Sequence, residues 1–191
     1  MDEYLAYIFT QISTIALWGV VERDYVKHEK NSLLAFGKII RRASLCKDMT
    51  QLTDAVESGL KAMFDSNEAK IVFIEGNKLV WYGNEPQNAP LTTGLCGYVL
   101  KNRIPQTIVR AVENIECNMM VDIQTNIPLY VIPLSVDGVY IGVVEMTKKN
   151  LINLSEIGED HKYVPVEESV LRIFKQLALL LKDIILSIKH N

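Results

Sequence analysis

Cysteine is the residue type with the clearest chemical potential in this sequence. The chain has three cysteines, Cys46, Cys96 and Cys117, an odd number at wide spacings. This pattern fits neither a disulfide framework nor a CxxC metal or redox pair, so it predicts free thiols in a reducing, cytoplasmic compartment. A free cysteine can act as a nucleophile once its thiol is deprotonated, but it is more often a small buried residue. Both interpretations are open for Cys96 and Cys117.

A second candidate group is the carboxyl of Glu145, which interrupts the strongly apolar run of residues 139–146. Alternation along a strand places Glu145 on the same face as Val143 and opposite Val144. Its side chain then either points into a pocket or lies at an exposed edge in a cross-strand pair. The sequence leaves these two alternatives equal.

Metal and cofactor sites are not predicted. The histidines lie far apart among charged residues, without a Cys, Asp or Glu partner at metal-ligand spacing; they are His28, His161 and His190. The sequence contains no P-loop, dinucleotide-binding glycine signature, HExxH motif or Ca²⁺ loop. An enzymatic interpretation therefore depends on the cysteines alone.

Composition limits the classes of partner. The 191 residues have room for one domain and an appendage, and their 49% hydrophobic content is enough for a sizeable core. The net charge is −3, from 20 basic and 23 acidic residues. The chain thus lacks the basic character that binding to a nucleic-acid backbone requires, and no nucleic-acid partner is expected.

Residues 1–47 are predicted to form a helical arm. Apolar residues recur at helical spacing in two stretches of residues 4–46, separated by the charged segment ERDYVKHEKN. Residues 4–21 carry no charge and just reach the length of a membrane span, but polar residues in their middle and acidic residues before them argue against insertion. We expect this helix to pack on the C-terminal helix or on a second subunit, because it would otherwise expose a large apolar patch.

The elements after the arm alternate between helical and strand patterns. A helix is predicted to begin near Asp48, because Asp48 and Gln51 have capping-box spacing before a run of apolar residues four positions apart. A hairpin over residues 70–75 and 79–82, a loop over 83–90 and a short helix over 94–100 follow. A strand at 107–109 leads into a long irregular connection that ends at Pro128.

The C-terminal part holds the clearest signals. Asp137–Gly138 predicts a tight turn between the apolar strands 130–136 and 139–146, because both turn positions need positive φ. The longest predicted helix covers residues 166–188 and carries two apolar stripes. Two stripes imply two packing partners, of which one is the sheet and the other is a neighbouring helix or subunit.

This order of elements resembles the GAF domain family. Four segments carry the resemblance: GLCGYVLKNRIP at 94–105, VIPL at 131–134, GVYIGVV at 138–144, and the final helix that starts at Glu167. The resemblance covers about residues 48–186 and implies that residues 48–191 form an α+β domain. Its antiparallel sheet of about six strands would have the terminal helices on one face and loops closing a ligand pocket on the other.

The resemblance also implies a range of functions. GAF domains bind cyclic nucleotides, tetrapyrroles or other small molecules, or bind nothing and serve as dimerising modules. The signature N-K…F-x-x-x-D-E of the cyclic-nucleotide branch corresponds here to Thr147, Lys148, Tyr163, Glu167 and Glu168. This match implies a Lys148–Glu167 ion pair that fastens the loop to the final helix. The changes of Asn to Thr and of Asp to Glu argue against binding of a cyclic nucleotide.

On the GAF pattern, the pocket would lie between the sheet and residues 94–128. Its predicted wall has few polar groups and no cationic side chain to neutralise a phosphate; it consists of Cys96, Tyr98, Cys117, Met119, Tyr130 and Glu145. Free methionine-(R)-sulfoxide reductases are similar GAF proteins, with a G-V-C-G segment matched by Cys96 and a later cysteine near the position of Cys117. The further cysteine that these enzymes carry shortly before that segment is absent from residues 81–93.

Three functions follow from these observations. The first, which we favour, is a non-catalytic GAF-type regulatory or sensory module without a cofactor. It would bind a small molecule, associate with a protein partner or a second copy through its N- and C-terminal helices, or do both. The second is a ligand-free scaffold subunit of a larger assembly. The third is a methionine sulfoxide reductase that uses Cys96 and Cys117.

Overall fold

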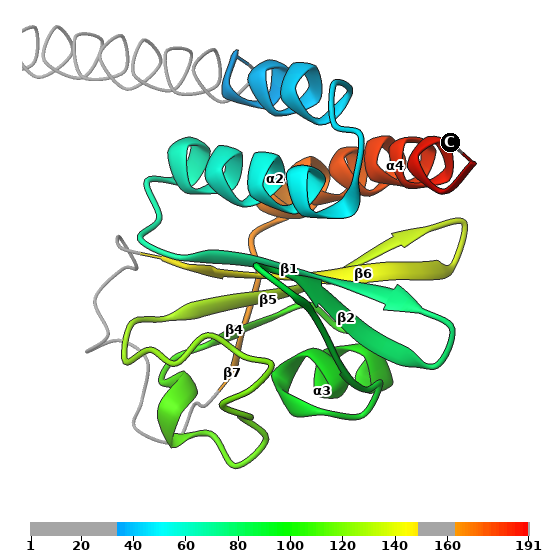
Figure 1. The fold of residues 1–191 in the computed structure, drawn as a ribbon. Coiled ribbons are helices and arrows are strands. Elements are labelled where there is room, and N and C mark those ends of the chain that lie inside the picture. Colours follow the sequence, from blue (N-terminus) through cyan, green and yellow to red (C-terminus); the bar gives the residue numbers. More distant parts are fainter. Residues whose placement is uncertain (1–33, 149–162, 191) are drawn as a thin grey trace, which may run out of the picture.

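The computed structural model describes residues 34–148 and 163–190. In this part of the chain, a seven-stranded antiparallel sheet has helices α2 and α4 on one face and helix α3 with the irregular connection on the other (Figure 1). The helices are α2 (Met49–Phe64), α3 (Gly94–Asn102) and α4 (Glu168–His190), with a 3₁₀ turn η1 (Ala111–Glu113). The strands are β1 (Ala69–Glu75), β2 (Lys78–Tyr82), β3 (Pro86–Pro90), β4 (Gln106–Ile108), β5 (Leu129–Val136), β6 (Val139–Thr147) and β7 (Tyr163–Pro165).

The strand order is β3-β2-β1-β6-β5-β4-β7, so β1, β6 and β5 form the centre of the sheet. The α+β fold with an antiparallel sheet agrees with the sequence prediction, which expected about six strands. β3 occupies residues expected to form a loop, and β7 lies in a segment expected to be a polar loop. Both pair with only one neighbour, at the edges of the sheet, so their pairing depends on that neighbour rather than on an apolar pattern of their own.

Local chemistry explains two of the main boundaries. The Asp48 carboxylate accepts a 2.8 Å hydrogen bond from the backbone N–H of Gln51 and caps α2, as its spacing predicted. Asp137 and Gly138 have φ values of 53° and 79°, which form the predicted turn between β5 and β6.

Two hydrophobic clusters lie on opposite faces of the sheet. The cluster under the helices includes Phe73, Tyr130 and Phe174, while the cluster under α3 includes Leu95, Val131 and Val143. A helical segment, residues 34–43, lies outside α2 (Figure 1) and packs onto it where the side chain of Ile39 meets Gly59. We call α2, α4 and this segment the helical layer.

The predicted apolar helix of residues 4–21 lies outside the described residues. Within the described ranges, no helix has both the length and the apolar content needed to cross a membrane.

Candidate functional site

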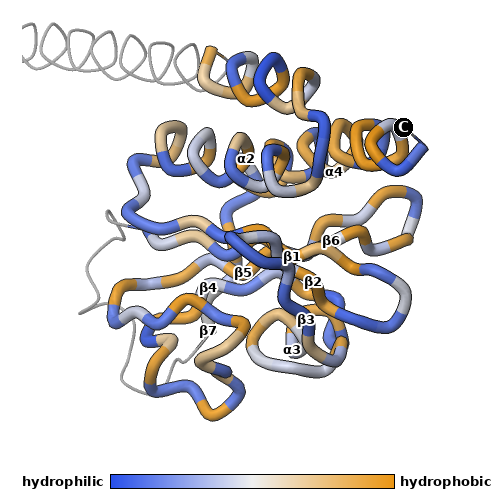
Figure 2. Tube along the Cα trace, viewed as in Figure 1, coloured by the Kyte–Doolittle hydropathy of each residue, from blue (hydrophilic) through white to orange (hydrophobic). Residues whose placement is uncertain are grey.

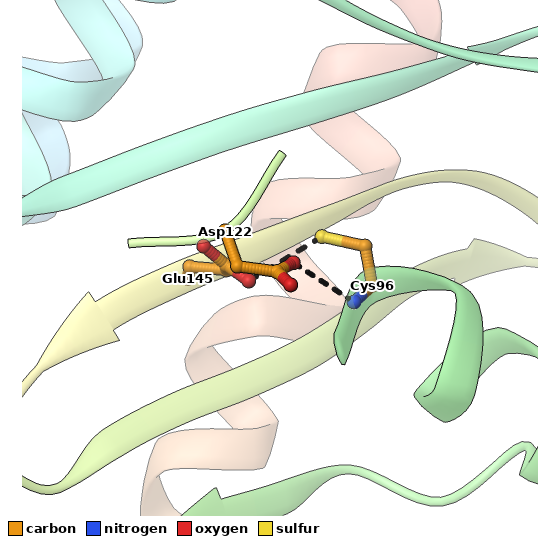
Figure 3. A group of neighbouring side chains, drawn as sticks. All are labelled: Cys96, Asp122 and Glu145. Atoms are coloured by element: carbon orange, nitrogen blue, oxygen red, sulfur yellow. Dashed lines mark hydrogen bonds between the residues drawn. The ribbon is translucent and has the colours of Figure 1, made fainter. Parts of the chain in front are cut away.

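Three buried side chains with reactive groups meet between the sheet and α3. They are Cys96 at the start of α3, Asp122 in the irregular connection and Glu145 on β6 (Figure 3). Cys96 and Glu145 are fully buried, and Asp122 is 4% exposed. Because buried carboxyl groups are costly without partners, the hydrogen bonds of this cluster decide what it can do.

The Asp122 carboxylate caps α3 from a distant part of the chain. It accepts hydrogen bonds from the backbone N–H groups of Leu95 at 2.9 Å and Cys96 at 3.4 Å. Thr93 immediately precedes α3 but makes no side-chain capping bond. Asp122 therefore accepts from amide groups that have no partner within the helix at its start. Its negative charge is also attracted by the positive end of the helix dipole.

The glycines of the GLCG segment allow this contact. Gly94 has a φ of 70°, and a Cβ atom there would lie 2.3 Å from Oδ2 of Asp122. A Cβ atom on Gly97 would lie 2.3 Å from the backbone carbon of Thr92. The spacing of the two glycines thus reflects two close approaches, one by a carboxylate and one by the backbone.

Glu145 of β6 fastens the irregular connection to the sheet. Its carboxyl accepts a 2.7 Å hydrogen bond from the backbone N–H of Ile123 and a 3.5 Å bond from the thiol of Cys96. Glu145 pairs across the strands with Lys70 of β1. The Lys70 amine donates to the carbonyl of Val121 and lies 4.8 Å from the centre of the Trp81 ring. Two strands therefore hold residues 121–123 through side-chain contacts.

The electrostatics of the cluster favour protonated groups. Burial, the charge of Asp122 and a hydrogen bond with Asp122 raise the pKa of Glu145 well above its usual range. Burial and the neighbouring Glu145 raise the pKa of the Cys96 thiol. A thiol that retains its proton is a poor nucleophile, so this environment opposes nucleophilic catalysis by Cys96.

The donor atoms of Cys96, Asp122 and Glu145 lie within 4.8 Å of one another, which is a spacing that a metal ion could bridge. The carboxylate oxygens, however, already accept hydrogen bonds from four backbone N–H groups: those of Leu95, Cys96, Asn118 and Ile123. We therefore interpret the cluster as a hydrogen-bonded network that holds the irregular connection against α3 and β6.

Solved structures with the same arrangement of elements are GAF domains. The nlh2 GAF domain of A. aeolicus in an inactive state superposes with a TM-score of 0.60 at 18% identity, over 83% of this chain and 97% of that one. The GAF domain of a phosphoenolpyruvate-protein phosphotransferase from Coxiella burnetii gives a TM-score of 0.61 at 14% identity, over 84% and 96%. This chain has a GAF fold.

The same GAF fold also occurs in an enzyme. Free methionine-R-sulfoxide reductase from Neisseria meningitidis, in complex with its substrate, superposes with a TM-score of 0.57 at 15% identity, over 82% of this chain and 89% of that one. No family model matches the sequence, and no curated protein matches it. Similarity at this level of identity establishes the fold, while the function must be argued from the site.

The GAF fold brings together only some of the residues predicted to form a pocket wall. Cys96 and Glu145 are in contact, and Cys117 is half-buried nearby, where its sulfur accepts a hydrogen bond from Gln124 at 3.2 Å. Tyr98 is half-buried and packs against the hydrophobic cluster under α3. Met119 is 83% exposed and so points into solvent rather than into an enclosed wall.

Tyr130 also differs from its predicted position. It lies in the hydrophobic cluster under the helices, on the face of the sheet opposite to Cys96. The cause is strand alternation: Val131, its neighbour on β5, pairs with Glu145 and points to the α3 side. The hydroxyl of Tyr130 hydrogen-bonds the carboxylate of Glu167.

Lys148 and Glu167 form an ion pair, the contact expected from the sequence. The Lys148 amine also lies 4.8 Å from the centre of the Tyr130 ring. Burial opposes ionisation of Glu167, but the hydrogen bonds from Lys148 and Tyr130 together lower its pKa. This group joins the end of β6 to the start of α4 on the helical side, away from Cys96.

Sequence reasoning missed Asp122 and Lys70. Neither residue stands out, because Asp122 lies in a segment without a sustained pattern and Lys70 is the second residue of a strand. No local signal pointed to Asp122: Thr93, a residue type that often caps helices, stands directly before α3, and only the structure shows that its side chain makes no capping bond.

Proposed function

We propose that this chain is a non-catalytic regulatory module of GAF fold that acts by associating with a second copy of itself through the helical layer. The supporting observation is an apolar strip on the outer face of α4. Leu179 and Leu186, one heptad apart, are 55% and 48% exposed. Large apolar side chains at this spacing are typical of helix-to-helix contacts between subunits.

Other apolar residues of α4 are only half-buried, among them Ile173, Leu180 and Ile184. In Figure 2, the turns of α4 that are in view carry mostly hydrophobic colouring. Next to its C-terminal end, a groove of about 240 Å³ opens between α4, β1 and β6, with Leu186 and Val139 in its lining. Val139 is 66% exposed. A partner helix could therefore bury Leu186 and Val139 together here. The sequence also predicts that the apolar segment 4–21 packs on the C-terminal helix or on a second subunit.

The site under α3 offers less to an anionic ligand. The first amide groups of a helix are a common binding position for phosphate or carboxylate groups. In this chain the carboxylate of Asp122 already accepts from the amides of Leu95 and Cys96, so a ligand would have to displace it. This internal anion supports association, rather than binding of a nucleotide, as the primary role.

The association is tested by replacing both exposed leucines, Leu179→Glu and Leu186→Glu, and measuring the molar mass by light scattering after size exclusion. We expect the wild-type protein to be a dimer and the double variant to be a monomer with an unchanged circular dichroism spectrum, because four carboxylates would face an apolar interface. The matched control is Ile115→Glu, at a residue that is 92% exposed on the other side of the sheet, and it should remain a dimer. A wild-type monomer over the accessible concentration range would refute self-association.

Methionine sulfoxide reduction is the second candidate. It is favoured by the fold shared with the reductase and by the placement of Cys96 and Cys117 near the same two carboxyl groups, Asp122 and Glu145. The raised pKa of each thiol opposes it. We expect turnover of free methionine-R-sulfoxide with a thiol reductant to equal that of a Cys96→Ser, Cys117→Ser variant. Turnover that the double substitution abolishes would establish the enzyme instead.

A further inference from the structure

Residues 117–123 are held in place mainly by two buried carboxyl groups. Asp122 accepts from the backbone N–H of Asn118 at 2.6 Å in addition to the two amides of α3, and Glu145 accepts from Ile123. These bonds position Val121 and Ile123 in the hydrophobic cluster under α3, where they are 0% and 8% exposed. We call residues 117–123 the loop; its closed position against α3 depends on the protonation state of these two carboxyls.

The charged groups around Asp122 and Glu145 favour a state in which the two carboxyls share one proton. Three elements place a titratable or charged group beside Glu145: the loop contributes Asp122, α3 contributes Cys96 and β1 contributes Lys70. Cys117 of the loop lies near Glu145 as well. Of these groups, only the Lys70 amine carries a positive charge, and it already donates to Val121. Two ionised carboxylates with oxygens within 4.8 Å of each other in a buried site would repel each other strongly. One proton between them removes the repulsion and supplies the hydrogen bond from Glu145 to Asp122.

We propose that Asp122 and Glu145 form a proton-dependent latch that holds residues 117–123 closed against α3, and that transfer of their shared proton to solvent releases this loop. The release breaks no covalent bond: the pair loses one proton to water or buffer, and the loop carries Asp122 away from Glu145. Val121 and Ile123 leave the cluster under α3 when the loop opens. The latch does not depend on the association proposed above.

The direction of the pH dependence follows from the pKa of Glu145. This pKa is raised in the closed state by burial and by Asp122, whereas in the open state the carboxyl meets water and returns towards its ordinary value of 4.5. The closed state therefore binds one more proton than the open state in the interval between the two pKa values. Its stability is complete below the ordinary pKa and decreases as the pH rises through this interval.

Hydrogen exchange of the backbone amides measures the latch directly. From about pH 5 up to the closed-state pKa of Glu145, with correction for intrinsic exchange rates, the protection of the amides of Leu95 and Ile123 should decrease about tenfold per pH unit, since one proton is linked to opening. These two amides donate to Asp122 and Glu145 across the boundary of the loop, so opening breaks both bonds. The amides of β5 and β6 should keep their protection, because they report on global unfolding. If those strands lose protection in parallel with the loop, or if the loop shows no pH dependence, the latch is refuted.

Two glutamine variants complete the experiment. Glu145→Gln retains a group that can accept from Ile123 and donate to Asp122 but cannot ionise, so its loop should stay protected over the whole range. Glu57→Gln is the matched control, because the pKa of Glu57 is also raised by burial and its carboxyl also accepts from a backbone amide, that of Ile71 on β1. Glu57 belongs to α2 on the opposite face, so this variant should respond to pH like the wild type. An equal pH dependence in Glu145→Gln and the wild type would assign the effect to other groups.

Discussion

Gly94→Ala is expected to destabilise the domain by about 3 kcal/mol or more. The residue has a φ of 70°, a left-handed conformation that costs a residue with a side chain about 1–2 kcal/mol. The new Cβ would also lie 2.3 Å from Oδ2 of Asp122, so the carboxylate would have to move and release the buried amide of Leu95 and the partly buried amide of Asn118. Leaving such groups unpaired costs about 1–3 kcal/mol.

This loss should lower the melting temperature by roughly 6 to 12 °C, measured by circular dichroism. Gly37→Ala is the control, because Gly37 lies in the helical segment 34–43 and a Cβ there would meet no atom within 4 Å. Alanine is the better helix former, so this control should be unchanged or stabilised by up to about 1 kcal/mol. Equal melting temperatures for the Gly94 and Gly37 variants would show that the contact with Asp122 does not require glycine.

Phe174→Ala should have the second large effect, a loss of about 3–5 kcal/mol of unfolding free energy. Phe174 is 2% exposed and belongs to the cluster between α4 and the sheet. Its ring stacks on that of Phe64 from α2, with centroids 5.8 Å apart. Removal of the ring leaves a cavity where the two helices meet on the sheet, and the rigid surroundings close it only partly.

Urea unfolding of the Phe174 variant gives the measurement, with Lys175→Ala as the control on the same helix. Lys175 is exposed, and its replacement should change the stability by no more than about 0.5 kcal/mol. Because α4 carries Leu179 and Leu186, a loosened α4 should also weaken self-association. A loss below about 1 kcal/mol in the Phe174 variant would mean that α4 contributes little to the core.

The Asp122 carboxylate occupies the N-terminus of α3 in this chain. In the closed state, Asp122 takes the place at the helix terminus that a carboxylate or phosphate ligand would use. The proposed latch and the proposed association thus concern different faces of the sheet. The first lies under α3 and the second lies on the helical layer.

The sequence by itself determined the elements whose signals are local. The capping of α2 by Asp48, the Asp137–Gly138 turn and the long C-terminal helix all depend on residues within a few positions of one another. Such contacts have the same geometry wherever the segment lies in the fold, so spacing alone predicts them. The order of these elements also identified the GAF arrangement.

Tertiary structure alone decided the composition of the site. Asp122 and Gly94 are brought together only when the irregular connection folds back onto α3, and no local pattern reports that contact. Tyr130 was assigned to the wrong face because the register of β5 against β6 sets which residues point towards α3. A shift of one residue exchanges the two faces of a strand, so a site built from strand residues depends on pairing across the sheet rather than on spacing along the chain.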